Sequence, residues 1–431
     1  MQKTPFSLYQ QEAPSLRFTP KQGPGYLYDV LILGGGFSGI SAALEAAKAG
    51  LTVAVIEGFE IGNGGSGRNG GHLLPDWPTD FSKLAKHLTP EEADAAFAIG
   101  MDTVSLAKDR IARYDIACDL QLGYVHCAYH DGHVRDLEDM QRAYEARGIS
   151  GLTYLGDKNA LHTHLGTDAY VAGLYEDGAG HINPLKYLQG LAKAAASEGA
   201  DIFQNQLVED IVISQNEAPH ELHCQTGDKF FGRHLLICGN GYIQKKAPKK
   251  MQRTLANVTS SILATQPLSD NLIKSLMPTR VAAADGNTAL NYYRIDAQGR
   301  MIFGGRASYL IPDDPAVIGH DLRRRMLSVF PELETVETAH IWSGRIGITT
   351  SRVPEFGTLG RGCYFVQGFS GHGVALSGMA GKILADHITE TSDAFQTLTK
   401  IRHLPFPGGP LRTPILALGM AYYKLRDKLR L

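Results

Sequence analysis

The sequence predicts an α/β fold in which a Rossmann-like dinucleotide-binding domain is interrupted by an α+β domain with a mainly antiparallel sheet. Three observations support this prediction. Residues 28–57 have the pattern of a strand, a glycine-rich turn, a helix and a second strand. Residues 363–387 repeat the order of strand, glycine-rich turn and helix. Between these segments, residues 258–310 alternate apolar and polar side chains, which is typical of antiparallel strands rather than of further βαβ units.

The first turn has the spacing G-x-G-x-x-G, formed by Gly34, Gly36 and Gly39 after an apolar strand. In such a turn the first glycine allows the tight bend, the second lets a pyrophosphate approach the backbone, and the third lets the helix pack on the strand. A second apolar strand leads to Glu57, placed where an acid accepts hydrogen bonds from an adenosine ribose. The alternative, a glycine-rich turn in an unrelated α/β protein, does not explain the position of Glu57.

Composition excludes several classes of protein. A length of 431 residues indicates two or three domains, and a formal net charge of −2 gives no electrostatic case for binding nucleic acid. The five cysteines contain no C-x-x-C pair, so neither a disulfide framework nor a zinc site is expected, and reduced, cytoplasmic thiols are favoured. His181, His223 and His234 lie on different predicted elements, which argues against a metal site. We expect no secretory signal and no transmembrane segment.

Two further glycine-rich stretches point to a bound ligand. The loop at residues 61–72 reads IGNGGSGRNGGH, so its backbone N–H groups can surround an anion while Arg68 adds positive charge; a flexible linker is the alternative. Strand 363–367 meets Gly371 and Gly373 at the start of a helix whose N-terminal dipole would stabilise negative charge on a reduced flavin. A simple βα turn would not call for these glycines and His372.

Taken together and in order, these segments resemble the D-amino-acid-oxidase-like (DAO) family of FAD-dependent amine oxidoreductases. The similar segments are the fingerprint at 34–57, the loop GGSGRNGG, the strand and turn HLLICGNGY, the segment WSGRIGITTSRVPEFG and the motif GFSGHGVALSGMAGKILA. The SGRNGG loop and the closing PFPGGPLRTPILALGMAYYKLRDKL look most like the γ-glutamylputrescine oxidase branch.

The resemblance implies an FAD-binding domain interrupted by a substrate domain, and it assigns residues to the cofactor. FAD is expected to bind non-covalently; attachment through His72 or Cys363 is the alternative. The residues implied in cofactor binding are Gly34, Gly36, Phe37, Ser38, Gly39, Glu57, Gly65, Ser66, Arg68, Asn69, Gly70, Val208, Gly239, Gly371, His372, Gly373 and Val374.

The expected domain organisation follows the order of these segments. A docked C-terminal helix is favoured over a membrane-surface helix in the basic tail. The expected ranges are an N-terminal arm at 1–27, an FAD-binding domain at 28–82, 170–257 and 335–395, a substrate domain at 83–169 and 258–334, and a C-terminal tail at 396–431.

The sequence also departs from the family at the substrate site. Glycine and amino-acid oxidases of this family hold the substrate carboxylate with arginines, at positions that correspond here to Ile346 and Gly371. Arg345 is adjacent and keeps such a contact open, and Ser351 replaces a frequent acid. The resemblance therefore favours an amine without a carboxylate at the reacting carbon, such as a polyamine or γ-glutamylputrescine.

The expected reaction oxidises a CH–NH bond to an imine by hydride transfer to flavin N5, and O2 or another acceptor then reoxidises the flavin. His372 is the predicted catalytic residue, with a structural role as the alternative. Tyr292, Tyr293, Arg294 and Arg345 are predicted to bind substrate, although the two tyrosines equally suit core packing. Competing hypotheses are an amino-acid, glycine or sarcosine oxidase of the same family, an NAD-dependent dehydrogenase and a non-catalytic FAD-binding protein.

Overall fold

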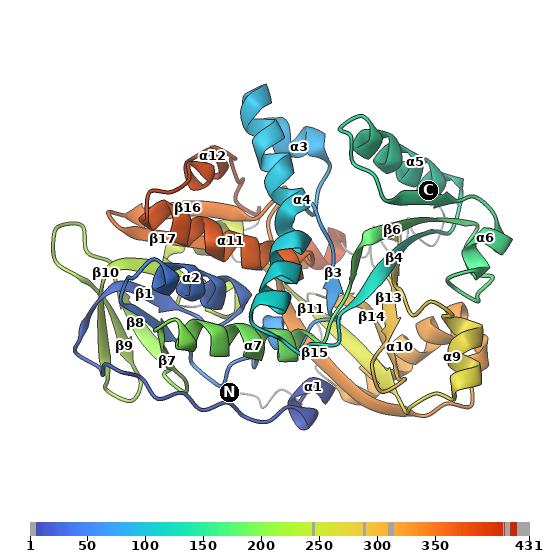
Figure 1. Cartoon of the computed structure of the whole chain (residues 1–431), viewed down its shortest axis with the longest axis horizontal. Helices are drawn as coiled ribbons and strands as arrows, with labels where there is room; N and C mark the ends of the chain where they lie inside the picture. Colours follow the sequence, from blue (N-terminus) through green and yellow to red (C-terminus); the bar gives the residue numbers. More distant parts are fainter. Residues whose placement is uncertain are drawn as a thin grey trace.

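The fold is built on two β-sheets that lie side by side (Figure 1). The computed structural model describes residues 6–243, 246–287, 290–308, 314–407, 409 and 414–419. In Figure 1 the first sheet lies on the left under α2, α7 and α11, and the second lies on the right with α9 and α10. Helix α4 stands between the two halves and packs against α11. The predicted α/β fold with a Rossmann-like part is confirmed.

Eight strands of the described residues form the first sheet, with β16-β17-β10-β1-β2-β7 in order and the hairpin β8–β9 attached to β10. Strands β17, β10, β1, β2 and β7 run parallel, as a doubly wound sheet requires. The strands are β1 (Leu27–Leu33), β2 (Val53–Ile56), β7 (Asp201–Phe203), β8 (Val208–Val212), β9 (His220–Cys224), β10 (Lys229–Ile237), β16 (Glu355–Gly360) and β17 (Cys363–Gln367).

Both faces of this sheet are covered, which explains why its strands read as continuous apolar runs. Val30 and Ile32 of β1 face a core shared with helices α2, α7, α11 and α4, whereas Leu31 and Leu33 face the β8–β9 hairpin and α8. The helices on these faces are α2 (Phe37–Lys48), α4 (Pro90–Arg113), α7 (Pro184–Ser197), α8 (Lys249–Thr254) and α11 (Gly373–Ile388).

Local signals in the sequence explain where these helices begin. Thr89 and Glu92 form a capping box at α4, in which the Thr89 side chain accepts from the Glu92 N–H and the Glu92 side chain accepts from the Thr89 N–H. At α7 the Asn183 side chain accepts from the Lys186 N–H at 3.1 Å, and Pro184 occupies the first helical position.

The second sheet has nine strands among the described residues, in the order β15-β11-β14-β13-β12-β4-β6-β3, with β5 beside β6. Only the β12–β4 pair is parallel within the described part, so the sheet is mainly antiparallel as predicted. The strands are β3 (His72–Leu73), β4 (Gln121–Ala128), β5 (Leu152–Leu155), β6 (Ala172–His181), β11 (Ala256–Thr265), β12 (Ala282–Asp285), β13 (Tyr292–Ile295), β14 (Met301–Ser308) and β15 (Thr338–Ile348).

One face of the second sheet packs into an apolar core, and polar side chains gather on part of the other face. The core under this sheet is apolar and includes helices α9 and α10; the sheet residues that point into it include Val125, Cys127, Tyr293 and Phe303.

The remaining helices of the described chain are α1 (Leu8–Glu12), α3 (Phe81–Ala85), α5 (Asp131–Glu145), α6 (Lys158–His162), α9 (Asp270–Leu276), α10 (Pro315–Val329) and α12 (Ala394–Thr399), with 3-10 turns η1 (Gly65–Gly67), η2 (Asn240–Tyr242) and η3 (Pro331–Leu333).

Sheet membership differs from the expected domain boundaries at three strands. Strands β3, β6 and β15 lie within ranges that we expected in the FAD-binding domain, but they pair in the second sheet. Their partners in the second sheet, such as β11 for β15 and β4 for β6, are remote in sequence, so no local pattern indicates which sheet each strand joins. We therefore propose that the substrate domain also includes these strands. Most of the expected C-terminal helix lies outside the described residues.

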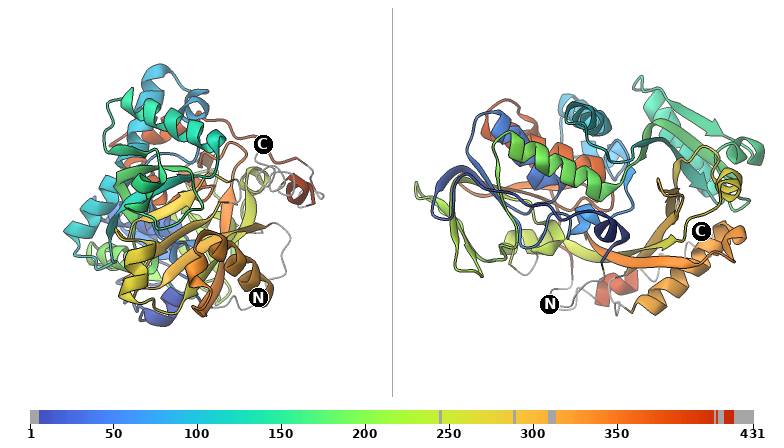
Figure 2. Two further views of the ribbon diagram at one scale, coloured as in Figure 1. Left: turned by 90° about the vertical axis from the view of Figure 1, so that its right-hand side faces the viewer. Right: turned by 60° about the horizontal axis from the view of Figure 1, so that its bottom comes forward.

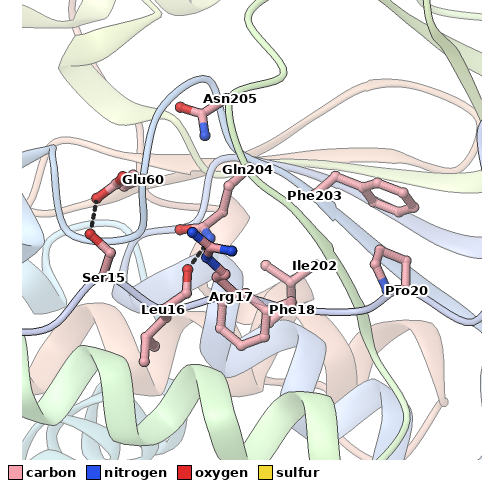
Figure 3. A pocket seen from close by; sticks show the side chains of 10 residues that line it. All are labelled: Ser15, Leu16, Arg17, Phe18, Pro20, Glu60, Ile202, Phe203, Gln204 and Asn205. Carbon is pink, nitrogen blue, oxygen red and sulfur yellow. Dashed lines mark hydrogen bonds between the residues drawn. The ribbon is translucent and has the colours of Figure 1, made fainter.

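The N-terminal arm crosses the first sheet and reaches the second (Figure 2). Asp201 on β7 accepts hydrogen bonds from the Lys21 and Gln22 N–H groups, and Gln189 on α7 donates to the Pro14 carbonyl. Helix α1 then packs Leu8 and Tyr9 against Trp342 of β15. A pocket of about 550 Å³ lies between this arm and the end of β7, and it contains none of the predicted site residues (Figure 3).

Candidate active site

The first glycine turn has the close contacts that its three glycines predict. Gly34 adopts a φ of 107°, which favours glycine. A Cβ on Gly39 would lie 1.9 Å from the Gly34 carbonyl oxygen, so helix α2 can approach β1 only because Gly39 has no side chain. A Cβ on Gly36 would lie 2.9 Å from Ser66 Oγ. The missing side chains of Gly36 and Gly39 therefore let strand β1, helix α2 and Ser66 of the 61–72 loop approach one another closely.

Glu57 lies at the end of β2, directly in front of this turn. Its Oε2 accepts from the Gly35 N–H at 2.8 Å, and its Oε1 accepts from the Phe59 N–H at 3.0 Å. Burial raises the pKa of the Glu57 carboxyl, and these two hydrogen bonds oppose the rise. The acid therefore sits within reach of the glycine turn, as recognition of an adenosine ribose requires.

Helices α2 and α11 cross at small residues. This close packing holds the two helices that follow the glycine turns at residues 34–39 and 368–373 against each other. A Cβ on Gly381 would lie 2.1 Å from the Ser38 carbonyl oxygen, and Ser41 Oγ donates to the Gly378 carbonyl at 2.5 Å. Phe37 buries its ring against Tyr187, so its side chain is part of the core.

The loop at residues 61–72 is an ordered cradle and not a linker. Asn69 Nδ2 donates to the Gly65 and Ser66 carbonyls, and Asn69 Oδ1 accepts from the Gly71 N–H at 2.8 Å. Ser66 Oγ accepts from the Phe37 N–H at 3.1 Å, which joins the loop to the start of α2. The loop therefore faces the same helix N-terminus that the fingerprint assigns to a pyrophosphate.

Arg68 lies in this loop but holds protein rather than projecting into the open. Its side chain is buried, Nε donates to the Ser343 carbonyl at 2.8 Å, and Nη1 donates to Gln10 Oε1 at 2.7 Å. Trp342 Nε1 also donates to the Arg68 carbonyl at 2.9 Å. We expected Arg68 to add charge beside a phosphate, but the structure directs its guanidinium to β15 and the N-terminal arm.

The start of α11 is open and rich in backbone donors. Gly371 is exposed with a φ of 93°, and no atom lies within 4 Å of a Cβ built there. Helix α11 begins at Gly373 without a side-chain cap, so the first-turn N–H groups, including that of Val374, have no partner within the helix. These donors and the helix dipole favour negative charge in front of the helix.

His372 faces away from these donors. Its Nε2 donates to the Pro75 carbonyl at 2.7 Å, which ties the start of α11 to the segment that follows the 61–72 loop. Burial lowers the pKa of His372, so the imidazole is neutral at pH 7. The predicted catalytic role of His372 stays a prediction, and its observed contact is a positioning one.

The turns after β1, β10 and β17 meet at the carboxyl ends of the strands, where doubly wound sheets bind ligands. A Cβ on Gly34 would lie 3.1 Å from Gly239, and Asn240 Oδ1 accepts from the Gly368 N–H at 3.1 Å. Val208 begins β8 with its side chain buried in the core on the far face of the sheet.

Arg345 lies at the exposed side of the cradle. Tyr242 OH accepts from the Arg345 N–H at 3.0 Å, and the guanidinium carbon lies 5.9 Å from the centre of the Tyr242 ring. A Cβ on Gly65 would lie 3.2 Å from the Arg345 carbonyl. The structure therefore places Arg345 beside the loop at residues 61–72, which we call the cofactor loop because the family resemblance assigns it to FAD.

The three residues predicted to bind substrate on β13 have different roles. Tyr292 lies on the polar side of the sheet, where its hydroxyl contacts Ser260 Oγ at 3.2 Å. Arg294 is on the same side, but Nε donates to the Gly70 carbonyl and Nη2 donates to Tyr9 OH. Tyr293 points the other way and is fully buried. The core-packing alternative therefore applies to Tyr293, because alternation along the strand sends it to the opposite face.

Sequence reasoning missed most of the polar side of this sheet. We use "polar sheet face" for the side chains that lie there together: Tyr124, His126, Glu176, Ser260, Tyr292, Arg294 and His72. The signal was present in the segment GYVHCA, where two polar aromatic residues alternate with two core residues. Glu176 carried no such signal, since only the pairing of β4 with β6 places it there.

Covalent attachment through Cys363 does not fit the structure. Cys363 is fully buried at the start of β17, and burial raises the pKa of its thiol to about 12. His72, by contrast, is the last residue of the 61–72 loop, and its Nε2 is buried without a hydrogen-bond partner among the described residues. Burial lowers the pKa of His72 well below 6.5, so its ring is neutral. Such an orphan nitrogen fits a site that receives a polar group from a bound molecule.

Comparison with known proteins agrees with this geometry. Residues 29–387 match the model of the DAO family, described as FAD dependent oxidoreductase. The chain is 33% identical over 402 residues to gamma-glutamylputrescine oxidoreductase of Escherichia coli (strain K12), covering 93% of each protein. It is 34% identical over 407 residues to the probable oxidoreductase OrdL of Haemophilus influenzae, covering 93% of this chain and 92% of that protein.

Solved structures support the fold. Glycine oxidase from Geobacillus kaustophilus superposes with a TM-score of 0.70 at 21% identity, covering 85% of this chain and 96% of that one. L-proline dehydrogenase from P. horikoshii gives a TM-score of 0.70 at 19% identity, covering 86% and 94%. Among the described residues, no helix has both the length and the apolar character needed to cross a bilayer.

The match of the family model over residues 29–387 and the relative at 33% identity show that the chain belongs to the FAD dependent oxidoreductase (DAO) family, and its cofactor is FAD.

Proposed function

We propose that this protein oxidises the CH–NH bond of an aliphatic amine, of the polyamine or γ-glutamylputrescine kind, to an imine. The observation that carries the proposal is the meeting of the cofactor loop and the polar sheet face. A Cβ on Gly70 would lie 2.7 Å from the Tyr292 ring, and the His72 ring stands edge-on to Tyr292 with centroids 5.4 Å apart. A substrate on this face would lie against the part of the loop that the family resemblance assigns to the flavin.

Bound FAD supplies the chemistry, as a two-electron acceptor that takes a hydride from the carbon beside the amine nitrogen. The chain contributes position and charge. Backbone N–H groups at the start of α11 stabilise negative charge without reorganising. His372, held by Pro75, fixes the start of this helix relative to the segment after the cofactor loop. Tyr292 and Ser260 offer hydroxyl groups that orient the substrate.

The kind of amine is inferred from the relative and from the arginines of the site. Gamma-glutamylputrescine oxidoreductase is the named relative at 33% identity over 93% of the chain. On the polar sheet face, Arg294 is held by Gly70 and Tyr9, so it does not offer its guanidinium to a substrate carboxylate in the described arrangement. Arg345 remains the candidate contact for a carboxylate remote from the reacting carbon.

We further propose that O2 or another acceptor reoxidises the flavin and that the protein works in the cytoplasm. All five cysteines are buried and free, which suits a reducing compartment.

An anaerobic substrate panel tests the proposed function. The purified protein is expected to absorb near ~450 nm, as bound flavin does. Putrescine, spermidine or γ-glutamylputrescine should bleach this band, while glycine, sarcosine and D-alanine should leave it. Bleaching by the amino acids alone would favour an amino-acid oxidase, and bleaching by none of the compounds would favour a non-catalytic FAD-binding protein. A colourless protein that reduces NAD would favour the dehydrogenase.

A further inference from the structure

One side chain of the N-terminal arm, Tyr9, reaches a buried arginine of the candidate site. Tyr9 is 2% exposed, and its ring stands edge-on to Trp342 with centroids 5.4 Å apart. A capping box between Ser7 and Gln10 fixes the start of helix α1, which carries Tyr9. The Tyr9 hydroxyl is therefore held in one place, where it accepts from Arg294 Nη2 at 3.1 Å.

Arg294 is a buried charge without an acidic partner. It lies on β13 and is 2% exposed, and it forms no ion pair with the residues that the structure describes. Asp296, two positions along the chain, pairs with Arg300 instead. Burying a charge without a counter-ion is costly, so the hydrogen bonds of the guanidinium determine where it lies. Among the described residues, its acceptors are Tyr9 OH and the Gly70 carbonyl.

The bond to Gly70 connects the arginine to the end of the cofactor loop. Arg294 Nε donates to the Gly70 carbonyl at 2.7 Å, and a Cβ on Gly71 would lie 3.2 Å from Arg294 Nη2. Gly70 also meets the polar sheet face, since a Cβ built on it would lie 2.7 Å from the Tyr292 ring. The guanidinium therefore joins the N-terminal arm, the end of the cofactor loop and the sheet.

We propose that Tyr9 is a positioning residue, which acts through Arg294 to hold the Gly70–Gly71 end of the cofactor loop against the polar sheet face. The inference rests on the proposed function, in which the flavin lies against this loop and the amine lies on that face. Reacting atoms must approach to about 3–3.5 Å, and a displacement of about 1 Å slows a reaction even when both partners stay bound. The arm thereby becomes part of the active-site framework.

The first test is Tyr9→Phe, which keeps the ring on Trp342 and removes only the hydroxyl. With the amine that reduces the wild-type flavin, the rate of anaerobic flavin reduction at saturation should fall about tenfold or more. FAD content should match wild type, and KM should stay within about threefold, because the loss affects geometry rather than ground-state binding.

Tyr28→Phe is the matched control. Tyr28 is 1% exposed, and its hydroxyl donates to Asp201 Oδ2 at 3.0 Å in the first sheet. This substitution also removes a buried tyrosine hydroxyl, but it does not touch Arg294 or the cofactor loop. The rate of flavin reduction in Tyr28→Phe should stay within about twofold of wild type, whereas an equal loss in both variants would overturn the inference.

A double-mutant cycle separates positioning through Arg294 from a general loss of packing. In an Arg294→Met background, Tyr9→Phe should cause no further loss of rate, because the group through which it acts is already absent. The same loss in both backgrounds would overturn the inference. If Arg294→Met does not fold, Arg294→Lys replaces it, since lysine keeps the charge but lacks the fork that reaches both acceptors.

The visible circular dichroism of bound FAD gives a measurement that does not depend on turnover. It should change in Tyr9→Phe and stay as in wild type in Tyr28→Phe. An unchanged spectrum together with an unchanged rate in Tyr9→Phe overturns the inference while the proposed function stands. If no amine reduces the wild-type flavin, the proposed function fails, and the circular dichroism still decides whether Tyr9 positions the loop.

Discussion

Gly39 allows helix α2 to pack against the turn after β1 because it has no side chain. A Cβ there would meet backbone at 1.9 Å, and backbone cannot yield as a flexible side chain can. We expect Gly39→Ala to destabilise the protein by roughly 2–4 kcal/mol, as overpacking against rigid backbone does, and to lower FAD content. Thermal unfolding and the ratio of absorbance at ~450 to 280 nm measure both effects.

Gly178 provides the matched control for this prediction. It lies on β6, its φ is not in the left-handed region, and no atom lies within 4 Å of a Cβ built there. Gly178→Ala should change stability by less than about 0.5 kcal/mol. Equal effects of the two substitutions would contradict the packing role of Gly39.

Asp76 predicts a pH dependence whose sign follows from its raised pKa. The raised pKa keeps this proton on the folded protein up to about pH 6, whereas the unfolded chain releases it near the ordinary pKa of 3.8. The contribution of Asp76 to stability is therefore greatest below that range and is lost as pH rises to about 6 and above. Asp76→Asn should be more stable than wild type at pH 7, by about 1–2 kcal/mol after allowance for partial exposure, and the gap should close near pH 4.

Denaturant melts of wild type and Asp76→Asn from pH 4 to pH 8 give this difference directly. Other carboxyls, such as Glu45, have lowered pKa values, so their contribution to the free energy of unfolding changes with pH in the opposite direction. These contributions are the same in both proteins and cancel in the difference, because the proteins differ only at Asp76. A gap that is constant across the range would show that Asp76 does not hold its proton in the folded protein.

Residues of the site were predictable from sequence to different degrees. Gly34, Gly39 and Glu57 could be placed because their roles depend on spacing within one βαβ unit. Tyr292 and Tyr293 were predicted together, either to bind substrate or to pack in the core, and only the packed sheet shows that Tyr293 belongs to the core. The contacts of Arg68 with Gln10 and Ser343 could not be predicted, because these partners are remote in sequence.

At the scale of elements, the N-terminal arm is tied directly to the cofactor loop. Gln10 Oε1 accepts from buried Arg68, and Gln10 Nε2 donates to Asn63 Oδ1 at 3.2 Å. Gln10→Ala removes both contacts, so the loop should hold FAD less firmly. We expect FAD to dissociate about tenfold faster, as loss of one hydrogen bond to a charged group implies.

Recovery of flavin fluorescence on release from the protein measures this rate. Ser15→Ala is the control, because Ser15 Oγ belongs to the same arm and bonds Glu60 at the surface. Equal dissociation rates in Gln10→Ala and wild type would show that the arm does not stabilise the loop.

The elements themselves followed from local signals where those signals were strong. The Asn183-Pro184 helix start, the strand–glycine–helix units and the hairpin at 292–308 all formed as predicted. The sheet that β3, β6 and β15 join did not follow from local signals, because it depends on long-range pairing that no local pattern records.

For the whole molecule, the central claim is that the two glycine turns bind opposite ends of one FAD. The direct measurement is the crystal structure of the FAD complex. The adenosine ribose should lie within hydrogen-bond distance of Glu57, and the flavin ring should lie between the start of α11 and Tyr292. A flavin ring bound elsewhere, or a ribose remote from Glu57, would contradict the account.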